Sequence, residues 1–260
     1  MAYETIKAER RGAALVITLD RPERRNAVSR QMMDDIVHAA TEAEQDPAVA
    51  GIVITGSDTY FSAGADLTET NALDGGPDMM RYFRKWHRTT RALEENEKPV
   101  IAAIEGFCFT GGFELAMACD LRVGARSTTY AVTSARIGTV AGAGGTQRLP
   151  RLVGPSRALE IMFDADPFDA EEAYRVGLLN KLVDDGTALD KALSMVEHYA
   201  TRGPISLAFI KHTVYGGMQM DLATGLDYEA FIASTIYMSD DRREGIGAFF
   251  EKRKPSFKGR

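Results

Sequence analysis

Cysteine, histidine and long apolar runs are all scarce in this sequence of 260 residues. The only two cysteines, Cys108 and Cys119, lie in apolar sequence, which excludes a disulfide scaffold and predicts reduced, buried thiols. The four histidines are scattered and no CxxC pair occurs, so no metal site is expected. The apolar run 13–19 ends at Asp20 and is too short for a membrane span or a signal peptide, so we predict a cytoplasmic protein with no membrane partner.

An excess of basic residues is also missing. Lys and Arg number 31 against 37 Asp and Glu, which gives a net charge of −6. Nucleic-acid binding usually requires a basic patch or stripe, so no nucleic-acid partner is expected. The hydrophobic share of 45% is typical of a soluble globular protein and indicates that the chain folds around its own core.

Segments that favour strands and helices alternate along the first half of the chain. Continuous apolar runs predict four strands, over 14–19, 49–55, 99–104 and 121–124. Helices are predicted from the N-cap Ser29 to Gln45 and over about 78–95. Continuous apolar runs are typical of parallel strands that helices cover on both faces, so an α/β fold is predicted.

The pattern becomes helical from Gly144 onward. Helix starts are predicted at Pro155-Ser156 and Asp169, and breaks at Gly154, Gly177 and Gly203-Pro204. We therefore divide the chain into a core, residues 1–195, and a helical C-terminal module, residues 196–260. No repeat of 20–50 residues is recognisable.

The stretch 105–120 holds the most informative motif. A buried strand leads into Gly111-Gly112, and a short, almost wholly apolar helix begins there with Glu114 in its first turn. A carboxylate is costly in such surroundings unless it is paired or used, so an acid/base role is favoured over a role that only complements the helix dipole. The two glycines indicate either an oxyanion hole beside this acid or a tight strand-to-helix turn.

Two further loops are rich in small residues. The loop 61–67 leaves backbone N–H groups accessible, and Asp66 within it is interpreted as a helix N-cap. The stretch 138–149 contains Gly-Ala-Gly-Gly but neither the phosphate-loop ending nor the GxGxxG spacing, which argues against a nucleotide-binding loop.

Taken together and in this order, four motifs make the whole chain resemble the enoyl-CoA hydratase/isomerase (crotonase) superfamily. They are Arg21-Pro22 with Asn26-Ala27, the segment 63–67, the segment 111–116 and the segment 142–149. The C-terminal segments 240–245 and 249–254 resemble the hydratase branch. The resemblance implies a crotonase-like spiral of ββα units whose helical C-terminal part builds a homotrimer or a dimer of trimers.

The resemblance also implies a substrate and a site. The substrate is an acyl-CoA thioester, so coenzyme A belongs to the substrate and no separate cofactor is expected. Backbone N–H groups of Ala65 and Gly111 are expected to bind the thioester carbonyl, with Glu114 as acid/base. The residues expected to hold coenzyme A are Arg25, Ala27, Ala63, Gly64, Ala65, Asp66, Leu67 and Gly111. Lys252 either reaches the nucleotide of a neighbouring subunit or is a solvated helix charge.

Ser134 is the departure from the family pattern. Hydratases of this family use two glutamates, and the second would stand where this chain has Ser134. A hydroxyl has a pKa far above 7 and cannot replace a carboxylate as acid/base. The dienoyl-CoA isomerases of the family carry an Asp at the place of Gly142, so this subtype is disfavoured.

Three interpretations follow. The chain is a hydratase or dehydratase-type lyase in which Glu114 moves the proton and Ser134 only orients, or an isomerase or other enolate enzyme that uses Glu114 alone, or an acyl-CoA-binding protein with little catalysis. Glu69, Glu105 and Asp120 are acids that could substitute in space, although Glu105 and Asp120 are typical strand-end or turn residues. The acyl preference is expected to depend on the segment 69–86.

Overall fold

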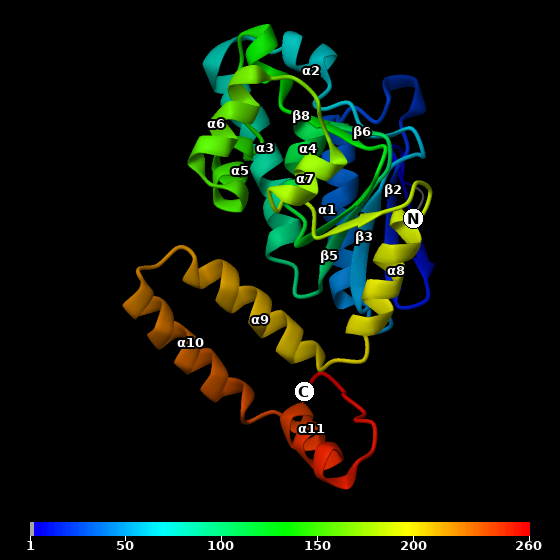
Figure 1. The fold of residues 1–260 in the computed structure, drawn as a ribbon, viewed down its shortest axis with the longest axis vertical. Coiled ribbons are helices and arrows are strands. Elements are labelled where there is room, and N and C mark those ends of the chain that lie inside the picture. Colours follow the sequence, from blue (N-terminus) through cyan, green and yellow to red (C-terminus); the bar gives the residue numbers. More distant parts are fainter. Residues whose placement is uncertain (1–2) are drawn as a thin grey trace.

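Two β-sheets surrounded by helices form the fold of the computed structural model, which describes residues 3–260 (Figure 1). The large sheet has the order β1 (Ile6–Arg11), β2 (Ala14–Leu19), β3 (Gly51–Thr55), β5 (Val100–Ile104), β7 (Leu121–Ala125) and β10 (Lys181–Val183). Its neighbouring strands are parallel except β1 and β2. The small sheet has the order β4 (Tyr60–Ser62), β6 (Phe107–Phe109), β8 (Thr129–Ala131) and β9 (Phe168–Asp169).

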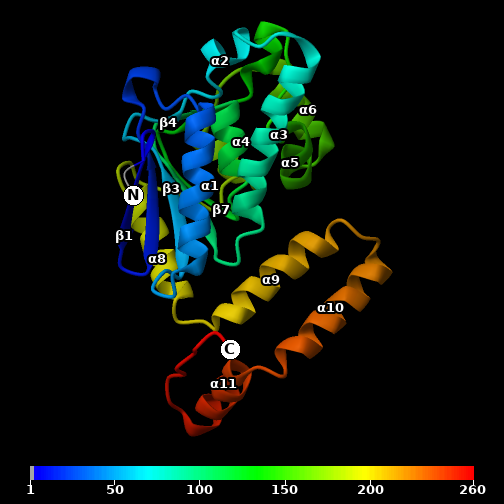
Figure 2. The same cartoon turned by 180° about the vertical axis from the view of Figure 1, so that it is seen from behind.

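Helices cover the large sheet on both faces. In β3, Ile52 and Ile54 belong to the core cluster that also contains α1 (Arg30–Gln45). Val53, between them, belongs to a second cluster, which contains α8 (Ala188–Tyr199). Figure 2 shows α1 in front of β3, and Figure 1 shows α8 from the other side. Because alternate residues of one strand enter two cores, the strand is apolar throughout, as predicted.

The chain repeats one unit, a strand in the large sheet followed by a strand in the small sheet and a helix. β3 and β4 precede α2 (Leu67–Asn71) and α3 (Gly75–Glu94). β5 and β6 precede α4 (Gly111–Met117), and β7 and β8 precede α5 (Gly145–Val153). The sequence did not predict the second strand of any unit, because these strands have only three residues each.

Most of the predicted elements are present, and three further strands, β1, β9 and β10, were not predicted. The four predicted strands and both predicted helices are confirmed, and Ser29 accepts the N-cap hydrogen bond of α1 from the Met32 N–H. β1 was missed because it is an edge strand that buries only Ile6. The region from Gly144, predicted as helical, also contains two short strands. β9 lies between α6 (Pro155–Asp164) and α7 (Ala170–Arg175), and β10 follows α7. Asp169 is the N-cap of α7, as predicted.

Three C-terminal helices extend away from the two sheets (Figures 1 and 2). They are α9 (Pro204–Gly217), α10 (Leu222–Ile236) and α11 (Asp240–Glu251). The predicted boundary at residue 195 falls inside α8, and the division into two domains stays a prediction. Within residues 3–260, no helix is long and apolar enough to cross a membrane.

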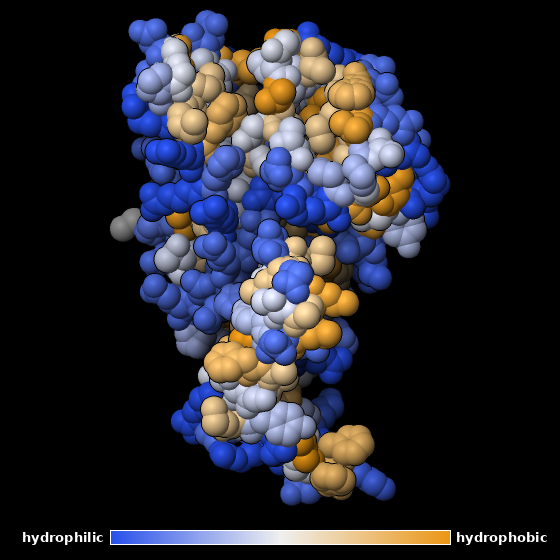
Figure 3. Space-filling model, turned by 90° about the vertical axis from the view of Figure 1, so that its left-hand side faces the viewer, coloured by the Kyte–Doolittle hydropathy of each residue, from blue (hydrophilic) through white to orange (hydrophobic). Residues whose placement is uncertain are grey.

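Large apolar side chains are exposed on these helices, and Figure 3 shows hydrophobic residues on the narrow lower part of the molecule as well as on its upper part. The exposed residues within the three helices are Ile210, Val214, Tyr215, Leu222, Leu226, Phe231, Ile246, Phe249 and Phe250. Within the described chain, α10 has no buried residue. A surface of this kind is typical of a protein–protein interface.

Candidate active site

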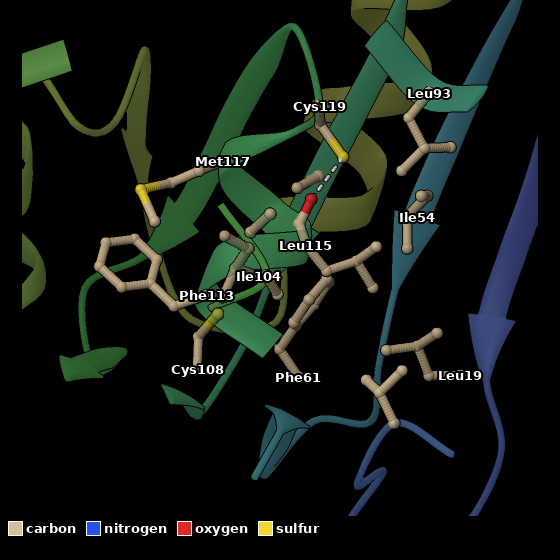
Figure 4. Packing of buried hydrophobic residues seen from close by; sticks show 14 of the residues in the cluster. Leu19, Ile54, Phe61, Leu93, Ile104, Cys108, Phe113, Leu115, Met117 and Cys119 are labelled. Carbon is tan, nitrogen blue, oxygen red and sulfur yellow. Dashed lines mark hydrogen bonds between the residues drawn. The ribbon is translucent and has the colours of Figure 1, made fainter. Parts of the chain in front are cut away.

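Glu114 lies in the first turn of α4, and its side chain is only 2% exposed. Phe113 and Met117 point to one side of this helix and Leu115 to the other, all into apolar packing (Figure 4). The carboxylate is held by two backbone donors, because Oε1 accepts the N–H of Ala143 at 2.8 Å and of Gly145 at 2.7 Å. Within residues 3–260, no hydrogen bond reaches Oε2.

The surroundings of Glu114 move its pKa to neutrality. Burial raises the pKa from an ordinary value of 4.5 to about 7, although the N–H groups of Gly145 and Ala143 and the charge of Arg148 oppose the rise. At neutral pH both the acid and the carboxylate are therefore populated. A group with this pKa suits proton transfer in either direction.

The backbones of Ala65 and Gly111 lie close together at the start of α4, the helix that carries Glu114. Val28 bonds to both neighbours of Ala65, since its N–H donates to the Gly64 carbonyl and its carbonyl accepts the Asp66 N–H. In an extended segment successive N–H groups point to opposite sides, so the Ala65 N–H points away from Val28. A Cβ on Gly111 would lie 2.8 Å from the Ala65 nitrogen. Two loops from different units thus bring two backbone groups together, and glycine at 111 permits the approach.

The turn before Gly111 has an unusual backbone. Thr110 has φ 40° and ψ −109°, a conformation that non-glycine residues rarely adopt and that the surroundings must enforce. Its N–H donates to the Ala131 carbonyl at 2.8 Å. Its Oγ1 accepts the Thr133 N–H at 3.1 Å and lies 2.8 Å from the Thr133 Oγ1. These bonds tie the start of α4 to the segment that contains Ser134.

Ser134 lies in a short 3₁₀ helix, Thr133–Ile137, and is 5% exposed. Its carbonyl accepts hydrogen bonds from the N–H and the hydroxyl of Thr139. Within the described part of the chain, its own hydroxyl makes no hydrogen bond. Ser134 is therefore a buried residue next to the Thr133–Thr110 contact.

The other candidate acids have structural partners. Glu105 accepts the N–H groups of Gly186 and Ala188 and so caps α8. Asp120 accepts the Val100 N–H and forms an ion pair with Lys211. Glu69 accepts the Arg30 N–H. Glu105 directly follows β5 and Asp120 directly precedes β7, as predicted for strand-end or turn residues.

The segments expected to hold coenzyme A run side by side. The Ala63 N–H donates to the Arg25 carbonyl at 3.0 Å, and Arg25, Ala63 and Leu67 are exposed. Ala27 is half-buried and Gly64 is buried. The structure therefore places the two backbone segments next to each other, partly at the surface.

Asp66 has a structural environment. It is the N-cap of α2, as predicted, since it accepts the Thr68 N–H at 3.0 Å, and it forms an ion pair with Arg21 at 3.0 Å. Burial raises its pKa, but the bonds to Arg21 and Thr68 outweigh burial and hold the pKa below its usual value. Asp66 is thus ionised and fixes the loop.

Three parts of the site were missed from the sequence. The backbone of Ala143 and Gly145 binds Glu114, and the ring of Trp86 would lie 3.2 Å from a Cβ on Gly111. The sequence shows Gly-Ala-Gly-Gly as a motif, but it does not show that this motif binds Glu114, because 31 residues separate Gly145 from that acid. Within residues 3–260, no group of three or more His, Cys, Asp or Glu could hold a metal.

Comparison with known proteins gives one consistent answer. The sequence model of the enoyl-CoA hydratase/isomerase family matches residues 9–260. Crotonyl-CoA hydratase of Syntrophomonas wolfei is 37% identical over 258 residues, which cover 99% of each chain. The mitochondrial enoyl-CoA hydratase of Pongo abelii is 38% identical over 98% of this chain and 88% of its own.

Solved structures agree. The enoyl-CoA hydratase of Bacillus anthracis superposes with a TM-score of 0.93 at 33% identity and covers 99% of this chain and 100% of its own. An enoyl-CoA hydratase structure from Geobacillus kaustophilus also gives 0.93, at 35% identity and 99% coverage of both. The crotonase-like α/β fold is confirmed. With a family model matched over nearly the full length and relatives above 30% identity, the chain belongs to the enoyl-CoA hydratase/isomerase family.

Proposed function

We propose that the chain hydrates enoyl-CoA thioesters, with the backbone N–H groups of Ala65 and Gly111 binding the thioester oxygen. The observation that carries the proposal is a buried acid with a pKa of about 7, on the helix that begins with Gly111. Donors aimed at the position of developing negative charge stabilise an enolate most strongly in a site without water. Relatives named crotonyl-CoA hydratase and short-chain-enoyl-CoA hydratase support a short acyl chain.

One acid suffices for a balanced reaction. The Glu114 carboxylate takes a proton from water while the water oxygen bonds to Cβ, and the electron pair of the double bond moves toward the thioester carbonyl. The enolate then takes the same proton from Glu114 at Cα, which restores the carboxylate. Ser134 orients the water in this scheme, and its hydroxyl transfers no proton.

Coenzyme A is held by the paired backbone segments. We place it along Arg25, Ala27 and residues 63–67, because the Ala63 N–H donates to the Arg25 carbonyl and so joins the two segments. Coenzyme A arrives with the acyl group, and no separate cofactor is needed in this scheme.

The test is Glu114→Gln, assayed for crotonyl-CoA hydration and for CoA binding. Because Gln keeps an oxygen for the two backbone donors, the fold and CoA binding should remain while hydration falls by roughly 10²–10⁴. Glu171→Gln, at an exposed ion pair of α7 with Arg126, is the matched control. Unchanged hydration in Glu114→Gln would overturn the proposal, and parallel loss of binding and rate would assign Glu114 a structural role.

A second candidate function rests on Ser134. Since the second acid of the hydratase pattern is absent, Glu114 alone could shift a double bond by moving one proton between two carbons. Conversion of 3-enoyl-CoA to 2-enoyl-CoA without hydration would favour this isomerase. Binding of both thioesters with turnover of neither would favour the third interpretation, an acyl-CoA-binding protein.

We also propose a homotrimer or a dimer of trimers. The support is the exposed apolar surface of α9, α10 and α11. Lys252 follows α11 in a left-handed conformation and is exposed, so it is free to meet a neighbouring subunit's nucleotide.

A further inference from the structure

Arg148 of α5 lies at the centre of a chain of contacts that ends on Glu114. Its Nε and Nη2 donate to the two carboxylate oxygens of Glu94 at 2.5 and 2.6 Å. Its Nη1 donates to the Ala143 carbonyl at 3.2 Å. The N–H groups on either side of Gly144, those of Ala143 and Gly145, both donate to Glu114.

Gly144 shows how closely the arginine is packed. It has φ +114°, and a Cβ at this position would lie 1.8 Å from the Arg148 Nη1. The guanidinium thus lies directly against the loop that holds the acid. Both partners of the ion pair are largely buried, with side-chain exposures of 17% for Arg148 and 23% for Glu94. A forked arginine–carboxylate pair of this kind fixes orientation as well as charge.

We propose that the Glu94–Arg148 pair is a positioning device for the catalytic acid: it fixes the loop 143–145 and thereby the place of the Glu114 carboxylate. The inference rests on the proposed function, because it assumes that Glu114 moves the proton. Glu94 anchors the device to α3, the helix whose Trp86 borders Gly111. One helix therefore supports both the acid and the backbone of Gly111.

Arg148 also acts on Glu114 by charge. It is the cation that lowers the pKa of this acid, against the larger effect of burial. The titratable residues on the other elements packed against α4 are Arg151 (α5), Tyr60 (β4), Cys108 (β6) and Arg122 (β7). Arg122 donates to the Ala116 and Cys119 carbonyls, at the far end of α4 from Glu114. From α3, His87 lies 3.0 Å from the Gly142 carbonyl.

The experiment compares pH profiles of kcat for crotonyl-CoA hydration. Arg148→Lys keeps the positive charge but loses the two-pronged hydrogen bonding to Glu94. We expect kcat to fall roughly 10- to 100-fold, because small displacements of a catalytic group are costly. KM should stay unchanged, and so should the limb of the pH profile near pH 7 that reports the ionisation of Glu114. Arg148→Gln removes the cation and should move the limb to higher pH. Glu94→Gln removes the opposing charge and should move it to lower pH.

Two further measurements separate the alternatives. The infrared carboxyl band of Glu114, taken as the difference from Glu114→Gln, reports its titration without activity. Arg175→Lys, in the exposed forked pair with Glu172, is the matched control and should change nothing. A lower kcat of Arg148→Lys, with KM and the Glu114 titration unchanged, supports the inference, and a native kcat in this variant would overturn it. Opposite shifts of the Glu114 titration in Arg148→Gln and Glu94→Gln support the contribution of charge, whereas no shift or equal shifts would overturn that part. Full activity of Glu114→Gln would instead overturn the proposed function.

Discussion

Lys211 of α9 and Asp120, the residue before β7, form an ion pair with 2.9 Å between Nζ and Oδ2. Both side chains are largely buried, and the Lys211 ammonium also donates to the carbonyls of Leu93 and Lys98. The Tyr215 hydroxyl donates to the other Asp120 oxygen at 3.0 Å. The pair therefore joins the C-terminal helices to the end of α3 and to the large sheet.

Breaking this pair should be costly. Lys211→Met leaves the buried Asp120 carboxylate without its cation, so the free energy of unfolding should fall by about 3–5 kcal/mol. The double variant Asp120→Asn/Lys211→Met removes both charges and should recover much of the loss. Denaturant unfolding of the two variants checks this, and equal destabilisation would contradict it.

Glu114 should make the stability depend on pH. Its pKa is about 7 in the folded chain against an ordinary 4.5, so the folded state binds more protons between these values. Stability should therefore fall as pH rises from about 4.5 to 7, by about 3 kcal/mol from this group. Glu114→Gln should be more stable than the native chain at pH 8 and similar at pH 4. A larger difference at pH 4 would contradict the sign.

Gly111→Ala tests whether the close approach of the Ala65 and Gly111 backbones is needed for activity. The added Cβ would lie 2.8 Å from the Ala65 nitrogen, so one of the two loops must shift. Loss of one oxyanion donor should lower kcat by roughly 10²–10³. Gly217→Ala, at the end of α9 with nothing within 4 Å of the new Cβ, is the matched control. Equal effects of both changes would remove the case for this donor.

The apolar surface of the C-terminal helices predicts the effect of a charge there. Phe231 of α10 is 68% exposed in the single chain, so Phe231→Asp should produce monomers if this surface is an interface. Light scattering at micromolar concentration measures the mass. Tyr174→Asp, an exposed aromatic position in α7, is the control and should keep the native mass. A native chain that is already monomeric would contradict the proposed trimer.

The sequence predicted the structural features that depend on interactions between residues close together along the chain. Four strands of the large sheet, β2, β3, β5 and β7, follow from local apolar runs, and the caps at Ser29 and Asp169 follow from side-chain hydrogen bonds. The short strands of the small sheet could not be predicted, because three residues carry no periodicity and pairing with distant strands stabilises them. Glu114 stood out because its helix lacks a polar face. Its partners Ala143 and Gly145 act through the backbone, which has no residue signature.

The last prediction concerns Ser134→Glu. If the chain is a hydratase limited by a missing second carboxylate, this change should raise crotonyl-CoA hydration, because the new acid could protonate Cα while Glu114 activates water. Proton transfer by such a group is worth roughly 10²–10⁴ in rate, or about 3–5 kcal/mol of barrier. Ser134 is 5% exposed, so the larger side chain must find space beside the Thr110–Thr133 contact.

Two buried carboxylates would also influence each other. Repulsion between like charges raises one of the two pKa values, which suits an acid and base pair at neutral pH. Ser134→Gln has nearly the same volume without the charge, and separates the effect of the carboxylate from that of filling the space. Higher hydration by the Glu variant alone, with CoA binding retained in both, would support the impaired hydratase. If the Glu variant folds, binds CoA and hydrates no faster than the native chain, Ser134 belongs to a site specialised for a different enolate reaction, and the isomerase becomes the better assignment.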